Sequence, residues 1–290
     1  MAVQKKKIWR RVGKLFLVIV TSLIALFVIS FIFLNTQAGK NFVRNQAVHY
    51  LQQKLKTKIS IESIDYRLPQ WITLNQVYIE DLKKDTLLYG EKLYVDLNMF
   101  KLLRGGIDIE KVYLKNCVAN IYKKPNDSFF NYQFIVDAFS GKKKSGAPVD
   151  TTALDISLKK LILSQVGVKF NDEAGGSYFS AWIDSVDIVN KTFQPDRTFF
   201  EVDRFFSTGI NFTMRNWKTP HPDSMPPAAE NASSAYSFFI SSHWLQAKNL
   251  HVLIDNQVSG LYYKNEVSSL YLSNGLYSLA QNRISADSMI

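Results

Sequence analysis

The sequence predicts a mainly β protein: an N-terminal transmembrane helix and a short amphipathic helix, followed by an elongated, curled, groove-like sheet of bulged, largely antiparallel strands. Three observations support this fold class. A run of 20 mostly apolar residues stands near the N-terminus, and one alternating pattern of apolar residues returns along most of the chain. Aromatic residues make up 13% of the 290 residues, which favours strands over helices.

The net charge of +10 is concentrated at the N-terminus. Residues 1–14 hold six Lys and Arg and no acid, which leaves +4 for the other 276 residues. A nucleic-acid binder with a basic face along its fold would distribute its charge differently. The single cysteine, Cys117, excludes an internal disulfide framework and a thiolate zinc cluster. Cys117 alternates with core positions and is expected to be a small buried hydrophobe.

Residues 15–34 are expected to form a transmembrane signal anchor. At ~1.5 Å per residue this run spans roughly 30 Å, the thickness of the hydrocarbon core of a bilayer. The apolar residues expected to hold it in the membrane are Leu15, Phe16, Ile19, Leu23, Phe27, Phe31 and Leu34. The six cations before the run place residues 1–14 in the cytoplasm and the rest of the chain on the other side.

Two alternatives for residues 15–34 are a cleaved signal peptide and a buried core helix. A cleavable apolar core usually has about 7–15 residues and is followed by small residues. Here the core is longer, and residues 36–38, Thr-Gln-Ala, are a weak cleavage site. A buried core helix would leave the basic flank without a purpose. We therefore expect an uncleaved, single-pass anchor.

Residues 35–57 are expected to contain a juxtamembrane amphipathic helix. Its apolar residues recur at helical spacing: Phe42, Val43, Ala47, Tyr50, Leu51 and Leu55. This side of the helix can pack on the end of a sheet or lie on lipid headgroups, and packing is the simpler expectation.

From residue 58 onward the apolar period changes to two, and one arrangement returns six times. Two alternating apolar residues are followed by two polar residues and two more alternating apolar residues, which is typical of a β-bulge or a tight bend. Composition alone would give about three matches. The runs are residues 59–66, 72–79, 107–114, 156–163, 181–188 and 245–252. In two of them the agreement continues, because Cys117, Ala119 and Ile121 stand in the phase of Val166, Val168 and Phe170.

The organisation predicted beyond the helices has three parts. A first β-rich segment covers residues 58–140 and ends in a helical turn at 131–139. A solvated linker follows at 141–153. A second β-rich segment covers residues 154–290, with a Pro-rich loop at 217–234, because no central strand tolerates four prolines. The last residues, 284–290, have the pattern of a strand, so we expect the N-terminal part of a longer protein.

The sequence holds no signature of catalysis. The four histidines do not stand at metal-ligand spacings, and the nucleotide-binding, hydrolase and metalloprotease motifs are missing. The acid pairs Glu80–Asp81, Asp172–Glu173 and Asp184 with Asp187 are expected to be solvated surface. We therefore expect a protein that is not an enzyme and that holds no cofactor or metal.

The order of these features resembles the N-terminal part of the AsmA-like and TamB-like family. Residues 35–40, Asn-Thr-Gln-Ala-Gly-Lys, are similar to the junction that follows the anchor in that family, with Gln37 where proline is usual. Residues 55–64 resemble the first strand of the family, and residues 74–81 resemble a strand that ends in Asp. Residues 85–89 look like the following hairpin, and residues 93–114 like the next run of alternating strands.

The resemblance implies a diderm inner-membrane protein with its bulk in the periplasm. Such proteins are implicated in outer-membrane biogenesis, in conducting phospholipids between the inner and outer membranes, and in helping the insertion of outer-membrane proteins. The implied partners are the inner membrane, phospholipid acyl chains and an outer-membrane β-barrel insertase. No nucleic acid is implied. The alternative function is a translocation and assembly scaffold for outer-membrane or surface proteins, and a third is a passive anchored interaction protein.

The candidate lipid groove is an apolar floor formed by the alternating strands. Its expected members are Ile72, Leu74, Val77, Ile79, Ile107, Ile109, Val112, Leu114, Ile156, Leu158, Leu161 and Leu163. The same side chains would also form an ordinary core closed by a second sheet or by helices, and the residues alone do not separate these two arrangements. Only the family resemblance favours the groove.

Overall fold

The computed structural model describes residues 2–67, 70–98, 101, 107–139, 156–194, 199–219, 239–278 and 283–290. The chain divides into two compact units, residues 1–49 and residues 50–290. The expected linker at 141–153 lies outside the described residues, as does the expected Pro-rich loop apart from residues 217–219.

The first unit contains a helix that is long and apolar enough to cross a membrane. α1 runs from Ala2 to Asn35, and the apolar stretch within it covers residues 16–35. The Thr21 hydroxyl donates a hydrogen bond to the carbonyl of Leu17, as a lone hydroxyl in an apolar helix does. The predicted anchor residues Phe16, Ile19, Leu23, Phe27 and Phe31 are exposed, Leu34 is half-buried, and the side chain of Leu15 lies outside the described part.

The second predicted helix is α2, which runs from Gln37 to Leu55. Thr36 caps it, because its Oγ1 accepts a hydrogen bond from the backbone N–H of Gly39 at 3.1 Å. A Cβ at Gly39 would lie 2.1 Å from the carbonyl oxygen of Phe33, so the chain needs glycine where the two helices meet. On the predicted apolar side, Leu55 is buried, whereas Phe42 and Tyr50 are exposed.

The second unit is built on one open sheet, and the described part of the chain contributes twelve strands to it. This confirms the mainly β class. The strands are β1 (Ile59–Ser60), β2 (Ser63–Arg67), β3 (Trp71–Glu80), β4 (Thr86–Leu97), β5 (Ile107–Lys123), β6 (Ile156–Asp172), β7 (Ser177–Gln194), β8 (Phe199–Asn216), β9 (Phe239–Asn256), β10 (Leu261–Ser278), β11 (Arg283–Ser285) and β12 (Ser288–Met289). One short helix, α4 (Gln133–Phe139), follows β5 at the position of the predicted helical turn.

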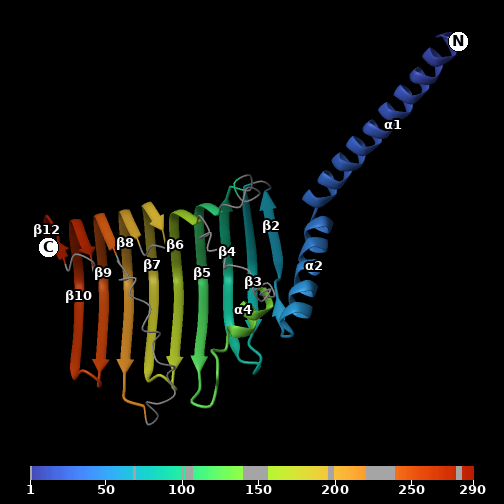
Figure 1. The fold of residues 1–290 in the computed structure, drawn as a ribbon. Helices are drawn as coiled ribbons and strands as arrows, with labels where there is room; N and C mark the ends of the chain where they lie inside the picture. Colours follow the sequence, from blue (N-terminus) through green and yellow to red (C-terminus); the bar gives the residue numbers. More distant parts are fainter. Residues whose placement is uncertain are drawn as a thin grey trace, which may run out of the picture. The chain divides into compact units, whose positions relative to one another are not determined.

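The strands lie side by side in chain order from β3 to β10 (Figure 1). The short strands β1 and β2 both pair with β3, and β11 and β12 both pair with β10. Neighbours are antiparallel except at two places, where β5 pairs with β6 and β8 pairs with β9 in parallel. The pairing of β5 with β6 joins the two predicted β-rich segments into a single sheet.

The parallel pairing of β5 with β6 explains the similarity of their sequences. Cys117 lies opposite Val166, Ala119 opposite Val168, and Ile121 opposite Phe170. Residues that stand in the same phase along the two segments are therefore direct neighbours in the sheet. Apolar side chains therefore lie beside apolar side chains, and the same face of both strands is apolar.

A row of residues without ladder pairing crosses the sheet and is called here the first seam. It consists of Gln76, Glu91, Asn116, Gln165, Asp184, Gly209, Asn249 and Ser268. Five of these residues, on β3, β5, β6, β8 and β9, have a backbone φ between 48° and 63°. A left-handed residue inside a strand turns the chain and moves the following side chains to the other phase.

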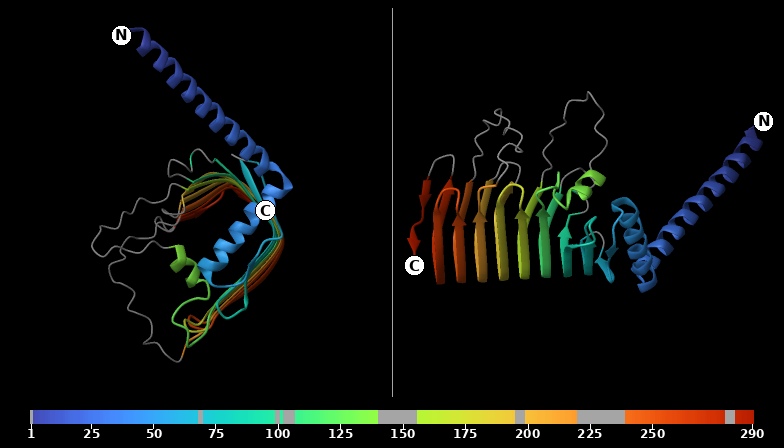
Figure 2. Two further views of the ribbon diagram at one scale, coloured as in Figure 1. Left: turned by 90° about the vertical axis from the view of Figure 1, so that its right-hand side faces the viewer. Right: turned by 90° about the horizontal axis from the view of Figure 1, so that it is seen from below.

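A second seam runs parallel to the first. It consists of Glu110, Lys159, Asp203, His243 and Asn274, which also lack ladder partners. The paired polar residues predicted as bulges lie at the first seam in residues 59–66, 72–79, 181–188 and 245–252, and at the second seam in 107–114 and 156–163. The strands from β3 to β10 bend together at the first seam, and five of them bend again at the second, so the sheet curves into a trough, which the left view of Figure 2 shows end-on.

Candidate functional site: the apolar floor of a trough

The register of the sheet assembles the predicted floor residues into rows that run across the strands. One row passes through Ile72, Val95, Val112, Leu161, Ile188, Phe205, Leu245 and Leu272. All eight side chains are apolar, and all are half-buried. A continuous apolar strip therefore extends from β3 to β10, at right angles to the strands.

Three further rows lie beside this strip. The second row is Leu74, Leu93, Leu114, Leu163, Val186, Ser207, Ala247 and Leu270. The third row is Val77, Gly90, Cys117, Val166, Ile183, Ile210, Leu250 and Val267. The fourth row is Ile79, Leu88, Ala119, Val168, Ala181, Phe212, Val252 and Asn265. Only Ser207 and Asn265 are polar in these rows.

The rows on the two sides of the first seam lie on one face. A Cβ at Gly90 would lie 2.4 Å from Cδ1 of Leu93 and 2.9 Å from Sγ of Cys117. Gly90 and Leu93 are three residues apart, so in a regular strand they would point to opposite faces. The bend at Glu91 brings them to the same face. The seam thus keeps the floor apolar on both sides of the bend.

This face is the concave face of the trough. The ring of Phe130, which precedes α4, lies 5.2 Å from the ring of Phe170 on β6. Phe170 continues the third and fourth rows by alternation, so it belongs to the floor face. Figure 2 shows α4 inside the curve of the sheet. The apolar rows therefore line the inside of the trough.

Within the part of the chain that the structure describes, no second sheet covers the floor. Of the ten predicted floor residues with described side chains, Val77 is buried, with 4% of its surface exposed, and the others are half-buried. In the described ranges every strand belongs to the same sheet, so none forms a second layer above the floor. Ile107 and Ile156 begin β5 and β6, but their side chains lie outside the described part.

Part of the floor was missed by the sequence-based list. β4 lies between β3 and β5 and supplies Leu93 and Val95, which connect the predicted residues of its neighbours. The alternation of Leu93, Val95 and Leu97 was the signal that would have found them. The predicted floor also stopped at β6, whereas the rows continue over β7 to β10.

The convex face is polar along the first seam. Glu91 accepts hydrogen bonds from Lys115 and Asn116, and these bonds lower the pKa of its carboxyl group. Gln165 donates to Asp184, which also accepts a hydrogen bond from the indole N–H of Trp182 at 2.9 Å. These contacts satisfy the polar side chains that the seam turns outward, so the bend does not place a polar group on the floor.

Residues 124–139, which follow β5, are held over the floor by a hydrogen bond to the buried carboxylate of Asp81. Asp81 is 1% exposed and accepts hydrogen bonds from the backbone N–H groups of Lys83 and Asp85, from the Tyr122 hydroxyl at 2.7 Å and from Nδ2 of Asn131 at 3.2 Å. The expectation that Asp81 is solvated was wrong. Its four partners let a carboxylate remain buried, because they replace water. Burial and the two acidic acceptors Asp81 and Asp85 raise the pKa of Tyr122.

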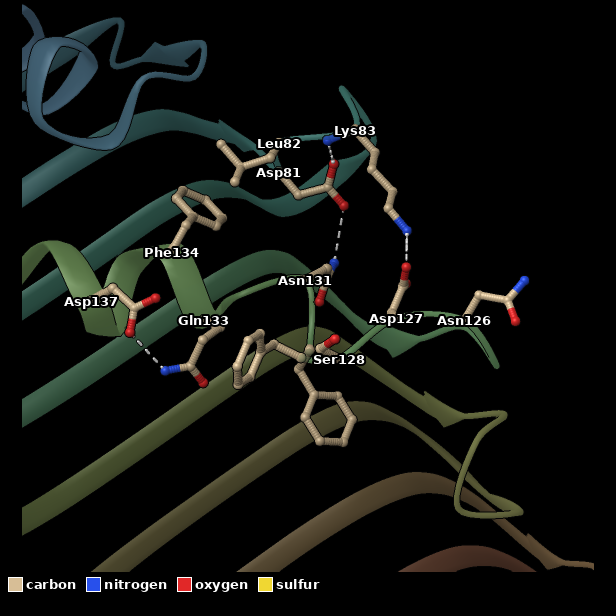
Figure 3. Close-up of a pocket in the computed structure, with 12 residues that line it drawn as sticks. Asp81, Leu82, Lys83, Asn126, Asp127, Ser128, Asn131, Gln133, Phe134 and Asp137 are labelled. Carbon is tan, nitrogen blue, oxygen red and sulfur yellow. Dashed lines mark hydrogen bonds and ion pairs between the residues drawn. The ribbon is translucent and has the colours of Figure 1, made fainter. Parts of the chain in front are cut away.

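The same segment borders a pocket of about 330 Å³ (Figure 3). Leu82 and Phe134 lie on one side of it, and the ion pair of Lys83 with Asp127, at 2.7 Å, lies on another. No group of three His, Cys, Asp or Glu side chains in the described residues could hold a metal ion, here or elsewhere. The lining of the pocket offers both apolar and charged contacts.

Comparison with the models of known protein families finds no match for this chain, and comparison with curated proteins finds none either.

Proposed function

We propose that the protein conducts phospholipids along the apolar trough, between the inner and outer membranes of a diderm bacterium, as an anchored component of outer-membrane biogenesis. The observation that carries this proposal is the strip of eight apolar, half-buried side chains from Ile72 to Leu272. The resemblance of the sequence to AsmA-like and TamB-like proteins supports the same role. α1 would hold residues 1–14 in the cytoplasm and the trough in the periplasm, because cations flank membrane helices on the cytoplasmic side.

The physical task of such a conduit is to keep acyl chains out of water. Each exposed methylene costs ~0.8 kcal/mol, so two chains of about 15 methylenes cost roughly 24 kcal/mol. The seven spacings between β3 and β10, at ~4.8 Å each, give a floor of roughly 34 Å. This is about twice the ~15 Å depth of one leaflet. The floor is therefore long enough for whole acyl chains, and its open side leaves the headgroup in water.

Site-specific photo-cross-linking in cells tests the proposal. A benzophenone side chain replaces Leu114 on the floor, and two further variants carry it at Lys115 and Val118. Lys115 forms an ion pair with Glu91 on the convex face, and Val118 is an exposed apolar residue beside Trp182 and Gly167. Mass spectrometry is expected to find phospholipid on residue 114 and none on residues 115 and 118. If residue 118 gave lipid adducts at the same yield as residue 114, the adducts would reflect general contact with membranes. If residue 114 gave no lipid adducts, the result would contradict the conduit.

A second candidate function is a scaffold that presents strands to an outer-membrane β-barrel insertase. The observation that favours it is the edge of β10, where residues 261–270 pair with β9 on one side and have no strand on the other within the described chain. Such an edge can template an incoming strand. Cross-links from residue 263 to outer-membrane proteins, together with no lipid on residue 114, would favour the scaffold.

A further inference from the structure

One end of the trough carries a surface that is both apolar and basic, which is called here the end patch. Its apolar members are Leu82, Phe129, Val136 and Phe139, with exposed fractions of 61%, 68%, 45% and 51%. Its exposed cations are Lys54, Lys56, Lys58, Lys83, Lys84 and Lys124. When several large apolar side chains with such exposed fractions lie together, they mark an interaction surface.

Hydrogen bonds, an ion pair and a cation–ring contact connect the three segments that make up the end patch. The Thr57 hydroxyl donates to the carbonyls of Glu80 and Asp81, both at 3.1 Å, which joins residues 54–58 to the turn after β3. Lys83 of that turn pairs with Asp127, and Leu82 and Phe129 border the same pocket (Figure 3). Nζ of Lys54 lies 4.4 Å from the ring centre of Phe139 at the end of α4. The patch is therefore one continuous surface.

The charge of the end patch indicates what it binds. Among residues 54–58, 80–85 and 122–139, the acids with exposed side chains are Asp85 and Asp137, against six exposed lysines. Two of these lysines are in ion pairs, Lys58 with Glu80 and Lys83 with Asp127, which leaves Lys54, Lys56, Lys84 and Lys124 to meet an anionic partner. Lysines around protruding apolar side chains are typical of proteins that dock on anionic lipid, because the cations meet the headgroups and the apolar tips enter the boundary below them. A protein partner of ordinary composition would not require this excess of cations.

The chain itself keeps a membrane within reach of this surface. Only α2, with 19 residues, lies between α1 and the segment that holds Lys56 and Lys58. At ~1.5 Å per residue that tether is about 28 Å long. If α1 spans a bilayer, this tether keeps residues 56–58 within about 30 Å of the bilayer surface on that side, so the membrane is at a high effective concentration for the end patch.

We propose that the end patch docks on the anionic surface of the membrane that α1 spans, and that it seats this end of the trough on the bilayer. This inference rests on the proposed function for its meaning, since a seated trough would receive lipid directly from that membrane. The docking itself is a separate property with a separate measurement.

Lipid nanodiscs that contain the full chain provide the test. Bimane is attached to Phe129→Cys or Val136→Cys in a Cys117→Ala background, and to Val258→Cys as control. Val258 is an exposed apolar residue, 56% accessible, in the turn between β9 and β10. Quenching by a nitroxide on lipid carbon 5 is measured in discs of phosphatidylcholine with about 30% phosphatidylglycerol, and in discs of phosphatidylcholine alone.

Quenching is expected at residues 129 and 136 in the anionic discs, with little at residue 258 and less in the neutral discs. Replacing Lys84 and Lys124 by Gln should lower the ratio of docked to undocked molecules by about 30-fold. Lys248→Gln, an exposed lysine on β9, should leave it unchanged. No quenching at residues 129 and 136, or equal quenching at residue 258, would overturn the inference. Lipid cross-links at Leu114 without quenching at residues 129 and 136 would refute the docking and leave the conduit. Quenching at residues 129 and 136 without lipid cross-links at Leu114 would refute the conduit alone.

Discussion

Replacing Leu114 by Asp should separate an open floor from a closed core. Leu114 is half-buried in the second row, between Leu93 and Leu163, whereas Val77 in the third row is 4% exposed. Full burial of a Leu side chain contributes about 1.5–3 kcal/mol. Leu114 has most but not all of its surface covered, so it contributes about 1–2 kcal/mol, and a carboxylate in its place keeps contact with water. Leu114→Asp should cost about 1–2 kcal/mol.

Val77→Asp should cost much more, because its carboxylate would lose water without gaining a partner. An uncompensated buried charge costs about 3–5 kcal/mol, and the lost apolar contacts add to this. For a unit of this size 1 kcal/mol corresponds to about 2–4 °C in Tm. We therefore expect a fall of about 2–8 °C for Leu114→Asp and of more than about 10 °C for Val77→Asp.

Thermal unfolding of the full chain in detergent micelles, followed by far-UV circular dichroism, measures this difference. Leu163→Asp should behave like Leu114→Asp, since Leu163 is also half-buried. Val77→Ala and Leu114→Asn are controls that remove the apolar side chain without adding a charge. If Leu114→Asp and Leu163→Asp lost as much stability as Val77→Asp, the floor would be a closed core and the argument for an open trough would fail.

Other predictions follow from single contacts. Asp81→Asn should destabilise the segment that Asn131 holds by about 2 kcal/mol, seen as faster limited proteolysis within residues 124–139; an unchanged cleavage rate would contradict the clamp. The pKa of Tyr122 is raised above its ordinary value of 10.0, so its contribution to stability is complete below pH 10.0 and is lost as the pH rises further. Tyr122→Phe should remove this alkaline step from a series of Tm measurements. Gly209→Val should cost about 2 kcal/mol or more in chemical denaturation, because φ is 63° there. Ser207→Ala should be neutral or stabilise by about 1 kcal/mol in the same assay, because the buried hydroxyl makes no hydrogen bond.

The bends of the sheet were predictable because each leaves a mark in its own strand. A change of apolar phase across two polar residues requires a break in the alternation, and the six runs place those breaks correctly. The left-handed conformation of Gln76 or Asn116 was not visible, since either residue also fits an ordinary strand. The alignment of the breaks into two seams depends on the register between strands, which a single sequence does not contain.

The error at Asp81 has a different physical origin. Two adjacent acids at the end of a strand are ordinarily solvated, and Glu80 and Asp81 have no local feature that distinguishes them. What buries Asp81 is the arrival of Tyr122 and Asn131, which are 41 and 50 residues away along the chain. Partners that are brought together only by the fold cannot be predicted from local pattern. The extension of the floor beyond β6 is different, since residues 181–188 and 245–252 carry the same local pattern as the predicted floor.

The parallel seams make the cross-section of the trough a property of each strand rather than of the whole sheet. The strands β5, β6, β8, β9 and β10 each carry two bends, and neighbouring strands repeat them at the same levels. Duplication of a hairpin would therefore lengthen the channel by about 10 Å without changing its width or the chemistry of its lining. The length of the trough can therefore change in evolution by gain or loss of hairpins. The shape of its cross-section depends separately on the residues at the bends of each strand.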